Sequence, residues 1–540
     1  MASRMMLFCP AIVPFVLLPA VSAERFLFIS TNLGHSHIGF TGRLADILVD
    51  AGHEVDFVIP LFNHFITSNG TKKANVTRVE LTATAELEEQ MKNMKWWNDV
   101  FENKKIPAES EKFKNMMAMY CESKRFLPVL VNGFQTELLE KLRSRNYKIG
   151  FALPLTDYTS YVHGIPTDYN NIPMMANQEQ INPISSLADR AVNAIMFWRT
   201  NLKMKPRPVW KVMQKLVSPN FPSSEEIMRR VDFVWLNTNK FINFPRSLPA
   251  KVKQIGGIGM ETLQKLDQTF TDIFDRASKG VILVSFGSIV NTDHVKPEIR
   301  DAFLDAFGQF PHYQFVWKVT NANGNNLTHL TSAHYKNVHA VNWMNQPSIL
   351  AHPHTVAFIS HMGSKSNFTS ERQELNAMFT GLNSLNEAAR FGVPVVSIPF
   401  FADQPFNTAV IVKRKLGVFV DRRHITTSTV ADAIRTILED PSYLKVAKEV
   451  SLKMADDPFS LRDVFVRHVE FSARNGPMNE FELPASQSSF IQQHSFDLLA
   501  LFTFSIFTLL LSLVLILKST ARLCTKLLQR YGQKKEKETA

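Results

Sequence analysis

Cysteine is almost absent from this sequence. The 540 residues include only three cysteines, Cys9, Cys121 and Cys524. Cys9 lies in an apolar N-terminal stretch and Cys524 in a basic stretch near the other end, which leaves Cys121 alone in the body of the chain. A single cysteine cannot form an internal disulfide. The sequence therefore excludes a disulfide scaffold, and the fold must depend on its hydrophobic core.

Long apolar runs are also scarce. The one charge-free run able to cross a bilayer is 498–517, because about 20 helical residues span a hydrocarbon core. A single run excludes a multi-span transporter and predicts one transmembrane helix at 498–517. The alternative, a buried helix of a soluble domain, is disfavoured by the length of the run.

The two ends of the chain predict its orientation in a membrane. Arg4 precedes a short apolar stretch, and small residues lead up to Ala23, so we expect a signal peptide at 1–23. The tail 518–540 carries seven basic and two acidic residues, which the positive-inside rule assigns to the cytosol. The body of the protein is then lumenal, in a single-pass type I arrangement.

Net charge and glycosylation triplets do little more to separate the possible functions and locations of the protein. The net charge is +11, and nearly half of it comes from the tail, so the composition gives no support for nucleic-acid binding. No cluster of metal ligands is visible in the sequence. Four N-glycosylation triplets agree with a lumenal body, although such triplets often arise by chance; they begin at Asn69, Asn75, Asn326 and Asn367.

The pattern of apolar segments predicts an α/β protein with two similar halves. Strand-like runs at 25–30 and 54–60 flank a helical pattern at 41–51, and this order is typical of a parallel βαβ unit. The same alternation restarts at 280–287 and continues with strands at 314–319, 355–360 and 393–399. We expect two Rossmann-like domains that meet near 256–259, with a ligand cleft between them.

The most specific motif lies between Trp343 and Gln404. Its residues follow predicted strands or glycine turns, where parallel sheets usually bind ligands. They combine an aromatic ring, a histidine, amides, a hydroxyl and two carboxylates: Trp343, Gln346, His361, Gly381, Asn383, Ser384, Glu387, Asp403 and Gln404. A shorter motif ends the strand at 280–287 and contains Ser285, Gly287 and Ser288, and Lys318 ends the next strand.

These spacings resemble the donor signature of the UDP-glycosyltransferases, and the chain from Arg25 to the basic tail resembles the UDP-glucuronosyltransferase family. The resemblance implies a GT-B fold, with two Rossmann-like domains facing a cleft plus one C-terminal transmembrane helix. It implies an acceptor-binding domain at 24–260, a UDP-sugar-binding domain at 261–450, and a returning helical segment and linker at 451–496.

The resemblance also implies a function. The family transfers a sugar from UDP-glucuronate or UDP-glucose to a small lipophilic hydroxyl acceptor in the endoplasmic reticulum membrane, as in detoxification. The UDP-sugar is a co-substrate, and no cofactor or metal is implied. Homo- or hetero-oligomers with relatives are possible partners. The sugar stays open, with Arg246 as one candidate to bind a glucuronate carboxylate.

Each donor residue has a chemistry that suits UDP. Trp343 can stack on uracil, and Gln346 can hydrogen-bond its edge. Glu387 can accept hydrogen bonds from the ribose hydroxyls, while Asp403 and Gln404 suit the hydroxyls of the sugar.

The phosphates need positive charge and N–H donors. His361 and the backbone N–H groups of the glycine turn at Gly381 can supply them. The turn from Ser285 to Ser288 offers further N–H and hydroxyl donors, and Lys318 can add charge nearby.

The predicted catalytic base lies in the N-terminal half. In the family, the histidine at the position of His37 removes the proton of the acceptor hydroxyl, and an aspartate supports it. A histidine is a suitable base near neutral pH when a carboxylate orients it. Asp157 is the first candidate for that carboxylate, and Asp168 is a poorer one.

Two departures from the family pattern favour an alternative. The family places the glutamate eight positions after the histidine, whereas His361 and Glu387 are 26 positions apart, which indicates an insertion of about 18 residues within 362–380. Compared with the family, a βα piece is also missing after Ala152. The alternative is a catalytically inactive relative that binds nucleotide or associates with active members.

Overall fold

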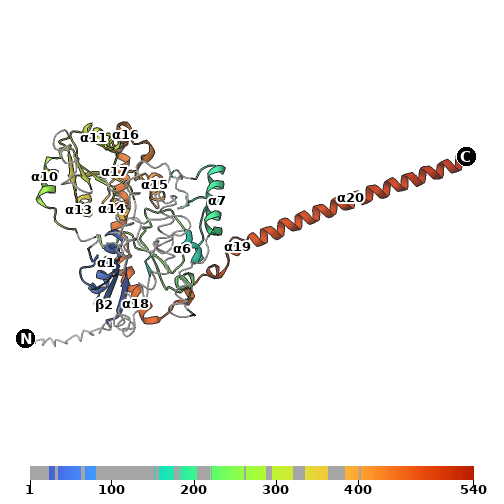
Figure 1. Ribbon diagram of the computed structural model, residues 1–540, viewed down its shortest axis with the longest axis horizontal. Helices are drawn as coiled ribbons and strands as arrows, with labels where there is room; N and C mark the ends of the chain where they lie inside the picture. The colour runs from blue at the N-terminus through green and yellow to red at the C-terminus, as the bar shows by residue number, and fades with distance from the viewer. Residues whose placement is uncertain are drawn as a thin grey trace, which may run out of the picture.

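The computed structural model describes most of the chain and divides it into two halves, from which one long helix projects (Figure 1). The described residues are 23–30, 35–61, 67–80, 151–152, 157–174, 181, 184–203, 219–220, 222–260, 263–287, 295–319, 335–362, 383–400 and 403–539.

The predicted βαβ unit opens the N-terminal half. Strands β1 (Arg25–Ile29), β2 (Glu54–Leu61) and β3 (Asn75–Glu80) form a parallel sheet in the order β1-β2-β3. Helix α1 (His35–Asp50) connects the first two strands and buries Leu44 and Leu48 in the core. These residues recur on one helix face, which is why the pattern could be recognised in the sequence.

Helix α1 begins at His35, earlier than the predicted 41–51. Gly39 lies in the added segment 35–40 and weakens the helix signal there, because glycine is a poor helix former. Gly42 is required by packing rather than by local propensity, since a Cβ atom there would lie 2.1 Å from the carbonyl oxygen of Gly70.

A second parallel sheet completes the described part of the N-terminal half. Its order is β4-β5-β6, and every described pair in it is parallel. The strands are β4 (Phe151–Ala152), β5 (Val234–Leu236) and β6 (Val252–Gln254), and the accompanying helices are α6 (Asp157–Val162), α7 (Leu187–Lys203) and α9 (Ser224–Arg229).

The C-terminal half contains one parallel sheet of doubly wound topology. Its strand order is β12-β11-β10-β7-β8-β9, so the chain builds outward from β7 in one direction and from β10 in the other. The strands are β7 (Val281–Ser285), β8 (Gln314–Lys318), β9 (Val338–Val341), β10 (Thr355–Ser360), β11 (Val395–Ser397) and β12 (Gly417–Phe419). Ligands of such sheets bind where the order reverses, which here is between the carboxyl ends of β7 and β10.

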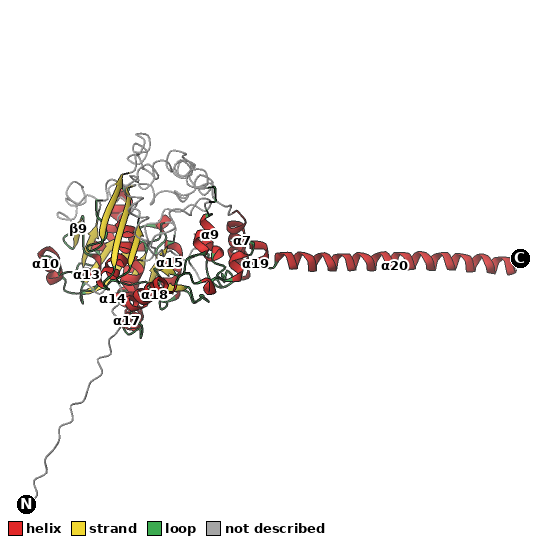
Figure 2. Cartoon of the chain, turned by 90° about the horizontal axis from the view of Figure 1, so that it is seen from below, coloured by secondary structure: helices red, strands yellow, loops and turns green. Residues whose placement is uncertain are grey.

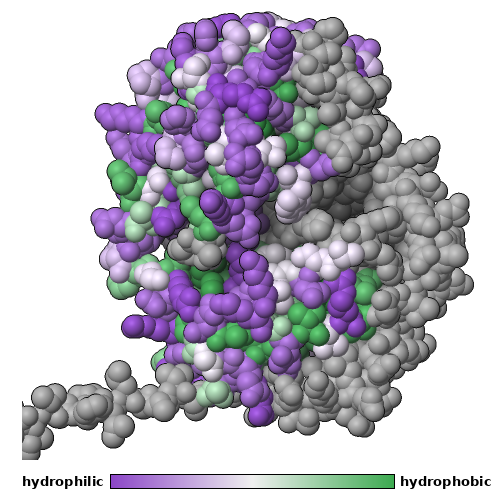
Figure 3. Space-filling model, turned by 90° about the vertical axis from the view of Figure 1, so that its left-hand side faces the viewer, coloured by the Kyte–Doolittle hydropathy of each residue, from purple (hydrophilic) through white to green (hydrophobic). Residues whose placement is uncertain are grey.

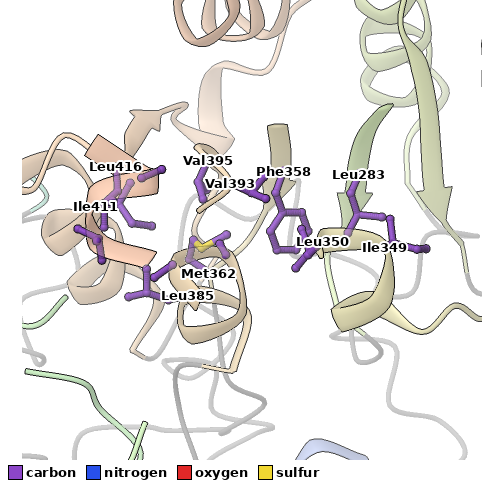
Figure 4. Packing of buried hydrophobic residues seen from close by; sticks show 14 of the residues in the cluster. Leu283, Ile349, Leu350, Phe358, Met362, Leu385, Val393, Val395, Ile411 and Leu416 are labelled. Carbon is purple, nitrogen blue, oxygen red and sulfur yellow. The ribbon is translucent and has the colours of Figure 1, made fainter. Parts of the chain in front are cut away.

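Two hydrophobic clusters cover the faces of this sheet. Figure 4 shows part of one cluster, in which the side chains of Met362, the residue after His361, and Leu385, the residue after Ser384, lie near each other. The helices of this half are α10 (Gln268–Arg276), α11 (Pro297–Gly308), α13 (Gln346–Leu350), α14 (Asn383–Phe391), α15 (Gln404–Lys413), the 3-10 turn η4 (Arg422–His424), α16 (Thr427–Glu439) and α17 (Pro441–Ala455).

After α17 the chain returns to the N-terminal half. Helix α18 (Leu461–Asn475) buries Phe465 in the core around α1 and β2, with its ring 4.9 Å from that of Trp235. On the same helix, Glu470 lies 3.2 Å from the buried His53 that follows α1. The 3-10 turns η5 (Asn479–Phe481) and η6 (Pro484–Gln487) and the short helix α19 (Phe490–Gln493) then lead to the last helix.

Helix α20 (Phe496–Thr539) extends away from the rest of the molecule (Figures 1 and 2). Its segment Phe496–Arg530 has a mean hydropathy of 2.6 in its most apolar window, and none of that window is buried. By length and composition this helix can cross a membrane, and it includes the predicted span 498–517.

Candidate functional site

The Ser285 turn and His361 meet at the switch point of the C-terminal sheet. Ser285 ends β7 and pairs in register with Ser360, the residue before His361. After Ser285 the chain turns at Gly287, whose φ of 79° is in the region that favours glycine. The Gly287 N–H lies 3.4 Å from the Ser285 hydroxyl oxygen. Ser288 lies outside the described residues.

His361 is held firmly at this edge. Its ring is buried, with Nδ1 3.4 Å from the Ser360 hydroxyl and the ring centre 6.4 Å from that of Phe400. The next residue, Met362, adopts a φ of 52°, and its carbonyl accepts a hydrogen bond of 2.8 Å from Asn407 in α15. A methionine rarely adopts this φ, so packing must impose it. The residues that follow, 363–382, include Gly381 and the predicted insertion and lie outside the described residues.

Glu387 forms the polar centre of the donor motif. It is buried on α14 and accepts a hydrogen bond of 2.6 Å from Nε2 of Gln346 on α13. Burial raises the pKa of this carboxyl to about 7, although the Gln346 hydrogen bond and the charge of Arg43 act in the opposite direction. The side chain therefore changes charge near neutral pH.

Arg43 connects this centre to the N-terminal half. It lies on α1, the helix whose first turn contains His37, and its Cδ would be 3.2 Å from a Cβ atom at Gly259. Its charge favours ionised Glu387 across the boundary between the halves. The sequence analysis missed Arg43, because an arginine on an amphipathic helix carries no signal that distinguishes it from a surface charge.

Trp343 presents a large aromatic surface beside the sheet. Its side chain is 66% exposed, and the Lys318 ammonium lies 5.0 Å from the ring centre. Partial burial lowers the pKa of Lys318. The lysine, which was expected near the phosphates, is thus placed against the indole in a cation–π contact.

Asp403 and Gln404 lie buried at the start of α15. Oε1 of Gln404 accepts a hydrogen bond of 2.7 Å from the backbone N–H of Phe400. Oδ2 of Asp403 accepts one of 2.8 Å from Asn407, on the next turn of the helix. These bonds fix both side chains next to the segment that follows β11.

The remaining predicted residues are only partly described. His37 lies in the first turn of α1, and Asp157 begins α6, but the side chains of both are outside the described part of the structure. Asp168 accepts hydrogen bonds from Asn171 in an exposed turn. Asn69 and Asn75 are exposed, and Asn326 and Asn367 fall outside the described residues.

Asn383 and Ser384 begin α14 and bring the helix N-terminus to the same edge of the sheet. Seen from the side opposite α20, the described surface is mostly hydrophilic, and it is hollowed between an upper and a lower lobe (Figure 3). Among the described residues, no group of three or more histidines, cysteines or carboxylates is arranged to hold a metal ion.

Known proteins resemble this chain in sequence and in fold. The human protein UDP-glucuronosyltransferase 3A2 is 24% identical over 567 aligned residues, which cover 99% of each chain. The Caenorhabditis elegans protein ugt-47, which carries the name of a UDP-glucuronosyltransferase, is 26% identical and covers 88% of this chain and 89% of its own length.

Solved structures show the same architecture. The calicheamicin glycosyltransferase CalG4 matches with a TM-score of 0.52 at 17% identity, covering 84% of this chain and 100% of its own. TcCGT1, solved in complex with UDP, matches with a TM-score of 0.51 at 15% identity and the same coverage of each chain. The GT-B fold expected from the sequence is confirmed.

The family model for "UDP-glucoronosyl and UDP-glucosyl transferase" matches residues 26–372 and 376–535. Most of the chain, including both halves of the fold and the apolar helix, falls within these matches. The protein belongs to this family of UDP-glycosyltransferases.

Proposed function

We propose that this UDP-glycosyltransferase conjugates a glucuronate residue from UDP-glucuronate to the hydroxyl group of a small lipophilic acceptor. Two observations carry the donor side. Ser285 pairs in register with Ser360, the residue before His361, at the carboxyl ends of β7 and β10, and Gln346 donates a hydrogen bond to Glu387 on α14, the helix that follows β10 in the chain. This edge is where a doubly wound sheet binds a nucleotide.

The nucleotide would bind through its base, ribose and phosphates in turn. The exposed ring of Trp343 offers a flat surface on which uracil can stack. Glu387 would accept hydrogen bonds from the ribose hydroxyls once it is ionised, with Gln346 holding the carboxylate in place. The N–H of Gly287 and the first N–H groups of α14 would bind the phosphates.

Transfer would occur in one inverting displacement. His37, at the start of α1, would accept the proton of the acceptor hydroxyl as its oxygen attacks the anomeric carbon. The bond from that carbon to the phosphate oxygen breaks, and UDP leaves with the electron pair, stabilised by the N–H donors of the C-terminal half. Asp157 is our candidate for the carboxylate that orients His37. Because backbone dipoles and side chains can supply the positive field, we propose that no metal or other cofactor takes part.

Arg246 supports glucuronate rather than glucose as the sugar. Its guanidinium carbon lies 5.6 Å from the ring centre of Phe406, in the first turn of α15. That helix begins at Gln404, and Asp403 precedes it. Asp403 and Gln404 are the two residues expected to bind the sugar. A guanidinium suits a carboxylate. An Arg246→Gln variant should lose its preference for UDP-glucuronate over UDP-glucose in a donor competition assay.

The location and partners follow from the same proposal. We propose that α20 crosses the endoplasmic reticulum membrane once, that residues 1–23 are a signal peptide, and that the catalytic body is lumenal and glycosylated. We also propose that the protein can associate with copies of itself or with relatives. Protease protection of the body in sealed microsomes, together with cleavage of the tail, would test the orientation.

An inactive nucleotide-binding protein is the second candidate function. The long spacing between His361 and Glu387 favours it, because additional residues separate the histidine from α14. The test is incubation of microsomes containing the protein with labelled UDP-glucuronate or UDP-glucose and a panel of phenols. Conjugates that disappear with His37→Ala would support the transferase, whereas UDP binding without any conjugate would support the inactive candidate.

A further inference from the structure

Three asparagines connect the N-terminal half to the helix of the donor motif. Asn237 directly follows β5, whereas Asn383 and Asn386 lie one turn apart on α14. Asn237 and Asn386 are buried. We propose that Asn237 and Asn386 are positioning residues that set the orientation of the Asn383 amide, so that Asn383 presents its NH2 group to the UDP phosphates. This inference rests on the proposed UDP-sugar site.

The orientation of the first amide is set by the backbone. Nδ2 of Asn386 lies 3.0 Å from the backbone carbonyl oxygen of Asn237. A carbonyl oxygen can only accept a hydrogen bond, so the atom of Asn386 that faces it must be the NH2 group. The assignment of this amide therefore does not depend on distinguishing nitrogen from oxygen by shape.

The other two orientations follow from the first. The same Nδ2 of Asn386 lies 3.2 Å from the side-chain oxygen of Asn237, which must therefore be an acceptor. The NH2 group of Asn237 then faces Asn383 and donates to its Oδ1 over 2.9 Å. Asn383 is left with its NH2 group on the side away from Asn237. Reversing any one amide would bring two donors or two acceptors together.

The surrounding backbone holds this chain of amides close. A Cβ atom at Gly256 would lie 2.5 Å from the backbone of Thr238 and 2.8 Å from Oδ1 of Asn386. The glycine therefore allows the segment after β6 to pass against Asn386. Phosphate oxygens only accept hydrogen bonds, so an NH2 group at Asn383 attracts them, whereas its oxygen would repel them.

The test compares UDP with uridine, which lacks the phosphates, by calorimetry on the full-length protein in nanodiscs. Asn237→Leu removes the donor to Asn383 without adding charge, and Asn237→Asp requires the Asn383 amide to turn around. Both variants should weaken UDP binding about tenfold or more and change uridine binding by less than about twofold. In an Asn383→Ala background, Asn237→Leu should cause no further loss, because the amide that it orients is gone.

Equal losses for UDP and uridine would overturn the inference, because a merely structural role predicts them. Unchanged binding of both ligands would also overturn it. If the wild-type protein binds uridine and UDP equally weakly, the proposed function fails and the amide inference fails with it. Should Asn237 variants not fold, Asn386→Leu gives the same comparison, since it releases the Asn237 amide.

A separate observation concerns the exposed face of α7. Leu187, Val192 and Ile195 are 74%, 48% and 56% exposed. At 100° per residue they fall on one stripe with the exposed Ala188 and Ala191, so the outward face of the N-terminal part of this helix, from Leu187 to Ile195, is apolar. A helix at a protein–water surface normally exposes polar residues, and an apolar exposed stripe marks an interaction surface.

The position of α7 indicates what covers this stripe. The helix lies at the side of the molecule from which α20 leaves (Figures 1 and 2). Its Trp198 ring is 5.4 Å from that of Phe496, the first residue of α20, and its Phe197 ring is 5.8 Å from that of Phe490 in α19. The opposite side of the molecule is mostly hydrophilic (Figure 3). We infer that α7 lies in the interface of the lipid bilayer that α20 crosses, an inference that rests on the proposed membrane span.

Lipid contact can be measured residue by residue. The three native cysteines are replaced by serine. Each of the single variants Ile195→Cys, Leu509→Cys (within α20) and Leu452→Cys (on α17) is then labelled with a fluorophore in full-length protein. Leu452 is the matched control, because it is 68% exposed and lies on a helix away from α20. Nitroxide-labelled phosphatidylcholine in the nanodisc should quench the labels at 195 and 509 several-fold more than the label at 452.

Quenching at 195 that equals the value at 452, with strong quenching at 509, would overturn the inference about α7 alone. Weak quenching at all three positions would overturn the membrane span as well.

Discussion

Nε2 of Gln346 donates a hydrogen bond of 2.6 Å to the buried carboxylate of Glu387, which ties the short helix α13 to α14. Gln346 begins the helix that follows β9, whereas Glu387 lies on α14, which comes after β10 in the chain. Two residues far apart in the donor motif are thus joined at the same edge of the sheet. This pair gives the donor site a group that titrates near neutral pH.

The affinity for UDP-glucuronate should rise with pH between about 6 and 8. The pKa of Glu387 is raised to about 7, so the carboxyl is largely protonated below that pH and cannot accept both ribose hydroxyls. If the ionised form binds, affinity increases up to about tenfold per pH unit below 7 and levels off above it. Calorimetry at pH 6, 7 and 8 measures this slope.

Glu387→Gln provides the control for this slope, because it keeps the shape and removes the titration. Its affinity should be lower at pH 8 and independent of pH. A slope that persists in the variant would assign the titration to another group.

Trp343 should contribute mainly to binding of the base. Stacking of a base on an aromatic side chain is worth about 1–3 kcal/mol, so Trp343→Ala should weaken both UDP and uridine about tenfold or more. Trp343→Phe keeps a flat ring and should recover most of the affinity. Binding of uridine that is unchanged in the alanine variant would show that uracil does not stack on this ring.

Phe465 should matter for the stability of the N-terminal half, although it lies near the C-terminal end of the globular part. It is buried against Trp235, and truncation of a buried phenylalanine typically costs about 3–5 kcal/mol. Phe471→Ala on the same helix is the matched control, since Phe471 is exposed, and it should cost less than about 1 kcal/mol. Urea unfolding of full-length protein in detergent compares the two. Equal effects would mean that α18 does not belong to this core.

His163 should make the protein less stable in acid. Burial, together with the charges of Lys251 and Arg229, lowers its pKa from 6.5 to about 3, and its ring nitrogens make no hydrogen bond to the described residues. Because the folded pKa lies below the unfolded one, the unfolded state takes up a proton first as the pH falls. Stability is complete above pH 6.5 and falls by up to about 1.4 kcal/mol per pH unit between 6.5 and 3.

The variant His163→Phe should have a flatter pH dependence of unfolding between pH 7 and 5 than the wild type. A wild type and variant with parallel curves would show that other groups dominate acid unfolding.

The sequence predicted the parts of the fold that have a regular pattern. The strands at 280–287 and 355–360 are present as β7 and β10, because continuous β-branched and apolar runs typify buried parallel strands. The short strands β9 and β12 were not predicted. Val338–Val341 contains a histidine and an alanine, and Gly417–Phe419 begins with glycine, so neither has a strong strand signal.

The donor motif was recognised from its spacing, but the contacts that orient it were not. Asn237 and Asn386 are buried polar residues without periodicity, and only the packing of the two halves brings them together. Lys318 was expected near the phosphates, and its contact with Trp343 could not be predicted, because Lys318 ends β8 whereas Trp343 follows β9, a strand that was not predicted. Tertiary contacts of this kind carry no local signal in a single sequence.

The decisive measurement is the affinity of the full-length protein for UDP, compared between His361→Ala and His312→Ala. His361 follows β10 and lies at the switch point between β7 and β10, at the carboxyl ends of the strands. The exposed His312 precedes β8, at the amino ends of the strands of the same sheet. We predict that the wild type and His312→Ala bind UDP alike and that His361→Ala binds it at least about tenfold more weakly. Wild-type protein without measurable UDP affinity, or equal affinities for the two variants, would contradict the proposed donor site.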